Sequence, residues 1–149
     1  MSTFSFAIVS DIHVFTGGGI PSNFPKVISQ LVSLAPRFVV VSGDATSGNP
    51  DDGASRDKVN LWWNSFRAAL KPLADADIAV LPIAGNHDYY TQAQRDGYQA
   101  AWARLSEDVS DRFILSGKPP LYYSLQAEEL HLTLLHVVDQ DLPQEVAQF

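Results

Sequence analysis

Apolar and polar positions along the chain predict strands and helices in alternation. Three short apolar runs rich in valine and isoleucine are each followed by polar or glycine-containing chain: residues 4–10, 37–42 and 78–84. Such runs are typical of buried strands. The segments between them place apolar residues at helical spacing, first between Pro25 and Pro36 and then over residues 59–73. This alternation predicts parallel strands joined by right-handed helical crossovers.

The second half of the chain has a different pattern. A third helical stripe follows the last apolar run: Tyr98, Trp102, Leu105 and Val109. Two further apolar runs, residues 121–126 and 131–138, are joined by the polar link at residues 127–129, which is typical of a β-hairpin. Residues 141–149 have only the start of a helical pattern. With no repeat or linker, we predict one α/β domain over residues 1–149, with a parallel β-α-β core followed by a β-hairpin.

Composition narrows the class of protein. A 149-residue chain with 46% hydrophobic residues is long and apolar enough for a packed core. The formal charge of −7 and the pI near 4.8 argue against an extended nucleic-acid surface, because affinity for phosphate backbones comes largely from Lys and Arg. The absence of cysteine excludes disulfides and thiolate metal sites. The first ten residues have no basic leader and are shorter than the ~20 apolar residues of a membrane span, so we expect a cytoplasmic protein.

Each of the three predicted parallel strands ends in polar side chains. The ends are Asp11-Ile-His13, Gly43-Asp44 and Gly85-Asn86-His87-Asp88. Because the carboxyl ends of parallel strands meet at one edge of a sheet, these groups should lie together. In extended chain, Asp11 and His13 would point the same way while Ile12 turns back to the core. Any one of these ends alone would be read as a turn, but three successive ends favour a site.

The donor set at this edge indicates metal binding. Carboxylate, imidazole and amide oxygen without thiolate suit Mn²⁺, Fe or Zn²⁺ better than Ca²⁺, which prefers oxygen ligands alone. We predict a two-ion site in which Asp11 and His13 hold one ion, Asn86 helps to hold the second and Asp44 bridges both.

The remaining two polar residues of the third end are assigned to the reaction. With Asn86 directed at a metal, His87 can donate a proton to a leaving oxygen or bind a phosphoryl oxygen. Asp88 would orient the His87 ring. Tyr89 and Tyr90 follow directly, and the sequence leaves open whether they line a substrate pocket or pack in the interior.

The ordered set of three motifs resembles that of the calcineurin-like metallophosphoesterases. That family's pattern is Asp-X-His, then Gly-Asp, then Gly-Asn-His-Asp/Glu, each after a strand, and the likeness runs from Phe4 to about Asp139. The resemblance implies the two-ion assignment given above and a substrate-facing His87. It also implies hydrolysis of a small phosphomonoester or phosphodiester, nucleotides included, by a hydroxide that two metal ions activate. The implied fold is the N-terminal part of an α-β-β-α sandwich.

One departure from the family pattern concerns the later histidines. The family completes its site with an isolated histidine and a Gly-His-X-His motif, and this sequence has neither. We expect packing or surface roles for the two other histidines, His131 and His136, which face opposite sides of their predicted strand. The domain is therefore expected to be incomplete at its C-terminus. Two alternatives stay open: a catalytically inactive scaffold for protein interaction, and a nuclease.

Overall fold

Two three-stranded sheets form the framework of the computed structural model, which describes residues 5–51 and 53–137. The first sheet is parallel, in the order β1-β2-β3. The second is antiparallel, in the order β4-β5-β6. The strands are β1 (Ala7–Val9), β2 (Phe38–Ser42), β3 (Ala79–Ile83), β4 (Leu115–Lys118), β5 (Tyr122–Ala127) and β6 (Leu130–Leu135). The predicted α/β class and its parallel core are confirmed.

Helices connect the parallel strands as the apolar spacing predicts. The helices are α1 (Phe24–Leu34), α2 (Arg56–Asp75), the 3-10 turn η1 (Asn86–Asp88), α3 (Gln92–Ala101) and α4 (Leu105–Asp108). A proline in its first turn starts α1, and α2 starts where the Ser55 side chain accepts a hydrogen bond from the Lys58 amide. In the ladder, Val9 lies opposite Val41 and Val41 opposite Pro82, so the three strands end in step.

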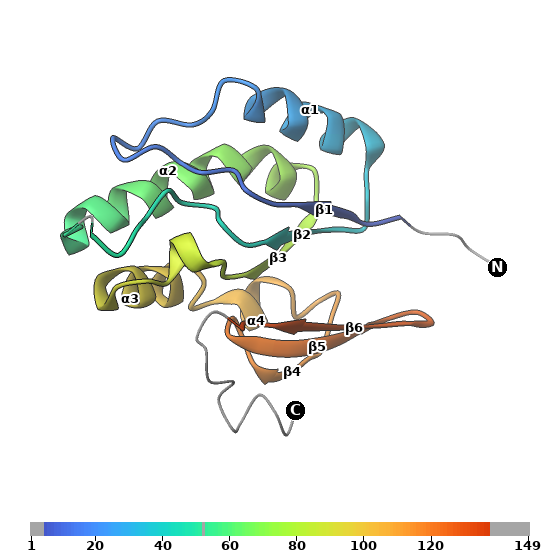
Figure 1. The fold of residues 1–149 in the computed structure, drawn as a ribbon. Coiled ribbons are helices and arrows are strands. Elements are labelled where there is room, and N and C mark those ends of the chain that lie inside the picture. The colour runs from blue at the N-terminus through green and yellow to red at the C-terminus, as the bar shows by residue number, and fades with distance from the viewer. Residues whose placement is uncertain (1–4, 52, 138–149) are drawn as a thin grey trace.

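Strands β2 and β3 are largely buried on both faces, which explains their continuous apolar runs, whereas Ile8 on the edge strand β1 is exposed. Helices α1 and α2 cover one face, and the antiparallel sheet lies on the other side (Figure 1). On the helical side, Val39 and Val41 belong to a core cluster with Trp62 and Trp63. On the opposite side, Phe38, Val40 and Leu81 pack with three residues of the second sheet: Tyr123, Leu125 and Leu134.

Two elements differ from those predicted. The stripe that starts at Tyr98 is not one helix, because α3 ends at Ala101 and α4 begins at Leu105. The break allows Tyr98 and Trp102 to join the helical-side cluster while Leu105 and Val109 join the inter-sheet cluster. The predicted hairpin is part of a three-stranded sheet, because β4 pairs with β5. The helix start expected at residues 141–149 lies outside the described residues.

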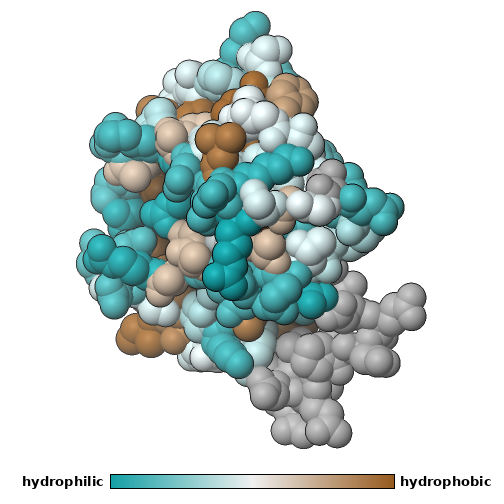
Figure 2. All heavy atoms as spheres, turned by 90° about the vertical axis from the view of Figure 1, so that its left-hand side faces the viewer, coloured by the Kyte–Doolittle hydropathy of each residue, from teal (hydrophilic) through white to brown (hydrophobic). Residues whose placement is uncertain are grey.

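The molecular surface at the end where the parallel strands terminate is mostly hydrophilic, with apolar side chains in small separate patches (Figure 2). Within residues 5–51 and 53–137, no helix combines the length and the apolar composition that crossing a membrane requires.

Candidate metal centre

The ends of β2 and β3 approach each other so closely that only glycine fits at the two facing positions. A Cβ atom on Gly43, whose φ is 104°, would lie 2.8 Å from the Gly85 Cα atom. One on Gly85 would lie 2.1 Å from Asp44 Oδ1. The absence of both side chains lets Asp44 Oδ1 accept a hydrogen bond of 3.0 Å from the His87 amide. The two glycines therefore bring Asp44 against the chain that carries His87.

The segment after β1 reaches the same place by an unexpected backbone path. Asp11 and His13 have φ angles of 55° and 53°, so the expectation of extended chain at these positions is wrong. Their amides donate instead to the carbonyls of Gly43 and Asp44, at 3.2 and 3.0 Å. The side chains still meet, with His13 Nε2 3.7 Å from Asp11 Oδ1, and Ile12 is buried as expected.

Three of the predicted residues bring metal-binding atoms together. His13, Asp44 and His87 each offer one ligand atom, and the three atoms lie within 4.8 Å of one another. All three residues are partly exposed, so an ion could reach them from solvent. Two imidazoles and a carboxylate form a donor set that fits a divalent transition-metal ion. Asp11 lies beside His13 but is not one of the three.

The His87 ring is held by a backbone carbonyl rather than by a carboxylate. Its Nδ1 atom lies 2.5 Å from the Gly48 carbonyl oxygen. A carbonyl only accepts, so Nδ1 carries a proton and Nε2 is left for a metal or a substrate. The ring also makes a T-shaped contact with the His13 ring, with centroids 4.9 Å apart.

Asp88 does not orient the His87 ring as we expected. Its carboxylate is 1% exposed and accepts four hydrogen bonds, from the Ala45, Thr46 and Gly85 amides and from the Thr46 hydroxyl. Burial raises the pKa of Asp88, and the hydrogen bonds from Thr46 and Gly85 offset part of that effect. Asp88 thus joins the segment after β2 to the segment after β3.

Comparison with known families agrees with this arrangement. The family model of the calcineurin-like phosphoesterases matches residues 4–144. The chain belongs to this family. No curated protein matches the chain. Membership supports phosphoester hydrolysis as the general activity and the binding of divalent metal ions, and the group of three residues gives such an ion a place.

Some contacts of this calcineurin-like phosphoesterase were not predictable from its motifs. Tyr90 lies at the rim of the site, where its hydroxyl accepts a hydrogen bond from Asn86 Nδ2 and its ring contacts His87. Tyr89 turns away and packs against Tyr98 and His136. Tyr89 therefore packs, and Tyr90 borders two residues of the candidate site.

The two later histidines make ordinary structural contacts in this calcineurin-like phosphoesterase. His136 Nδ1 lies 3.2 Å from the Ala84 carbonyl oxygen, and its ring packs on Tyr89. His131 is exposed beside Gln126. Each contact is of the packing or surface kind that we expected.

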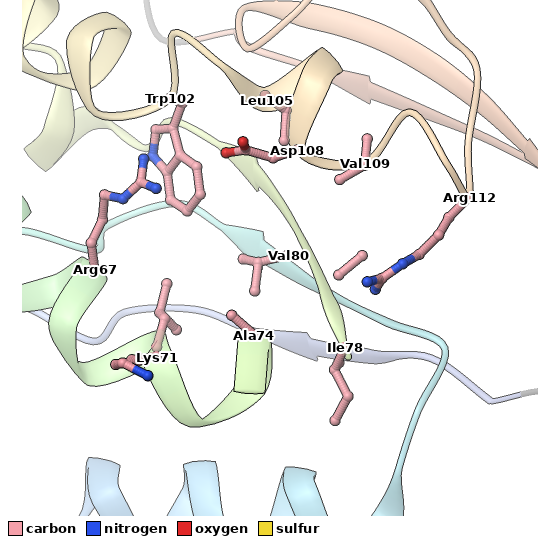
Figure 3. A pocket seen from close by; sticks show the side chains of 12 residues that line it. Arg67, Lys71, Ala74, Ile78, Val80, Trp102, Leu105, Asp108, Val109 and Arg112 are labelled. Atoms are coloured by element: carbon pink, nitrogen blue, oxygen red, sulfur yellow. The ribbon is translucent and has the colours of Figure 1, made fainter. Parts of the chain in front are cut away.

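Of two pockets in the described part of this calcineurin-like phosphoesterase, one adjoins a predicted site residue and the other does not. One of about 270 Å³ lies beside Asp11, between the end of β1 and the start of α1. A second, of about 370 Å³, lies between α2, the start of β3 and α4 and contains none of the predicted site residues (Figure 3). Two of its cations already have partners, since Arg67 donates to the Ala101 carbonyl and Arg112 to that of Asp77. We therefore place the chemistry at the strand ends.

Proposed function

We propose that this protein is a metal-dependent hydrolase of small phosphomonoesters or phosphodiesters, nucleotides included. The observation that carries the proposal is the convergence of His13, Asp44 and His87, one from each parallel strand end, in a member of a phosphoesterase family. The acidic balance of the chain favours a small substrate over a long polyanion.

We assign the metal-binding roles to four residues. Asp11 and His13 would hold one ion, Asn86 would help to hold a second, and Asp44 would contact both. Asp44 Oδ1 already accepts the His87 amide, so Oδ2 is the less committed oxygen. Mn, Fe or Zn suits this donor set. Bound ions supply positive charge that activates water and stabilises charge developing on the phosphoryl oxygens.

His87 is assigned to the leaving group of the substrate. Its Nδ1 proton is engaged by Gly48, so only Nε2 is available to the substrate. To protonate a departing alcohol, the ring must therefore carry a second proton on Nε2. The Gly48 contact would keep the ring from turning, and His87 offers one ligand atom to the same group as His13 and Asp44. The neutral ring would serve only as a hydrogen-bond acceptor at that atom.

The test is hydrolysis of p-nitrophenyl phosphate and bis(p-nitrophenyl) phosphate by the chain after metal removal with a chelator and after restoration with Mn²⁺, Zn²⁺ or Fe²⁺. We expect no turnover without metal, turnover with at least one ion, and none from Asp44→Asn under any condition. Metal binding without hydrolysis of either ester would favour the scaffold alternative. Salt-sensitive cleavage of single-stranded DNA together with inertness toward both esters would favour the nuclease.

A further inference from the structure

We propose that Tyr90 is a positioning residue, whose hydroxyl turns the carbonyl oxygen of Asn86 toward the metal site. This role rests on the function proposed above, in which Asn86 serves a metal. Tyr90 belongs to neither the ordered motif set nor the group of three residues that offer ligand atoms.

The chemistry of the amide creates the need for such a residue. An asparagine side chain has a carbonyl oxygen, which binds divalent cations, and an NH₂ group, which does not. The side chain of Asn86 is exposed, so burial does not decide which end of the amide faces the site. In the structure, Asn86 Nδ2 donates to the Tyr90 hydroxyl, so the NH₂ group is engaged by Tyr90 and Oδ1 is not.

Tyr90 is itself held in place on both sides. It stands between η1 and the capped start of α3, where the Thr91 amide donates to Gln94 Oε1 at 2.7 Å and the Gln94 amide to Thr91 Oγ1 at 3.3 Å. Gln94 is buried. The Tyr90 ring contacts the His87 ring at a centroid distance of 5.6 Å. Tyr90 is 37% exposed, so it is held by its place in the chain and by the His87 ring rather than by burial.

The two contacts of Tyr90 can be separated by substitution. Tyr90→Phe removes the hydroxyl and keeps the ring against His87, whereas Tyr90→Leu removes both contacts. Tyr89→Phe is the matched control, because it removes a neighbouring hydroxyl that accepts from Gln99 Nε2 at 3.4 Å. Loss of an outer partner of a metal ligand weakens metal affinity by 10- to 100-fold, and the partial exposure of this pair places the expected effect at roughly ten-fold.

The experiment titrates metal-free protein with Mn²⁺ and follows the free ion by electron paramagnetic resonance. We expect Tyr90→Phe to weaken the affinity of one of the bound Mn²⁺ ions by roughly ten-fold, and Tyr89→Phe to leave that affinity unchanged. In protein that already carries Asn86→Ala, the addition of Tyr90→Phe should have no further effect on the affinity. In hydrolysis at saturating Mn²⁺, Tyr90→Phe should recover the wild-type kcat while Tyr90→Leu should not, since only Tyr90→Leu removes the ring that packs against His87.

Two results overturn the role and differ in what else they overturn. The positioning role alone is refuted if wild-type protein binds Mn²⁺ and Tyr90→Phe leaves its affinity unchanged. It is also refuted if Tyr90→Phe weakens the affinity by the same factor whether or not Asn86→Ala is present. Wild-type protein that binds none of Mn²⁺, Zn²⁺ and Fe²⁺ refutes the proposed function and the role of Tyr90 with it.

Discussion

Asp88→Asn tests whether the buried carboxylate holds the two halves of the site together. One oxygen of Asp88 accepts from the Thr46 amide at 2.8 Å and the Thr46 hydroxyl at 2.9 Å; the other accepts from the Ala45 and Gly85 amides at 3.2 and 3.1 Å. An asparagine at this position can keep the hydrogen bonds from the Ala45 and Gly85 amides if its oxygen faces them. Its NH₂ group then faces Thr46. The hydroxyl can then accept while still donating to the His87 carbonyl, but the Thr46 amide loses its partner.

The expected cost follows from that one unpaired group. A buried N–H without a partner costs about 1–3 kcal/mol. Asparagine also removes the cost of burying a charge, which is the reason that the pKa of Asp88 is raised, so we expect a loss of about 1–2 kcal/mol. Asp88→Ala leaves three amides without partners and should cost about 3 kcal/mol or more, a large part of the ~5–15 kcal/mol of a typical domain.

Urea unfolding followed by tryptophan fluorescence measures these differences in the free energy of unfolding. The matched control is Asp75→Asn on α2, where an exposed carboxylate pairs with Lys71 and the loss should stay below about 0.5 kcal/mol. The claim that the cost follows from amides left without partners would be refuted by either of two results. One is equal stability of wild type and Asp88→Asn, and the other is an Asp88→Ala variant no less stable than Asp88→Asn. Metal affinity should fall in the same order as stability, because Asp88 joins the segments that carry Asp44 and His87.

Three further predictions concern the strand ends. Gly85→Ala should destabilise the fold by about 1–3 kcal/mol and weaken metal binding, since its Cβ would strike Asp44 Oδ1. Gly17→Ala, where a Cβ meets nothing within 4 Å, is the control in the same urea and metal titrations. Asp44→Ala should abolish binding of both ions by elemental analysis, and retention of two ions would exclude a bridging role. His87→Ala should lower kcat by roughly 10²–10⁴-fold with metal content kept. Loss of metal from that variant would instead make His87 a ligand.

The strand ends were predictable because their pattern reflects a strong physical constraint. Val41 and Pro82 are opposite each other in strands that are largely buried on both faces, so the runs that contain them are continuously apolar, and Val9 lies opposite Val41 in the edge strand. The polar groups that follow such runs must then emerge at one edge. Asp11 and His13 were placed together correctly but for the wrong reason, because nothing in the sequence signals two non-glycine residues with positive φ.

The contacts that shape the site were not predictable in the same way. Gly48 holds His87 only because of the course of the chain after β2, and a single glycine in a polar segment is common in turns of every kind. The third helix was mispredicted because Trp102 and Leu105 keep helical spacing across a break, although they serve cores on opposite faces of the sheet. Strand β4 has one apolar residue, Leu115, apart from its glycine and so lacks a periodic signal.

The assembly of the site from three separate strand ends has a consequence for folding. Asp44 meets His13 once β1 and β2 have paired, but His87, which lies 43 positions after Asp44, joins them only when β3 has paired as well. A chain with unpaired strands therefore has no preformed site. An ion that binds at the strand ends would bind the native state alone. At a hundred times its dissociation constant, such an ion would add about 2.7 kcal/mol to the free energy of unfolding. Metal supply would then set the working stability of this protein as well as its activity.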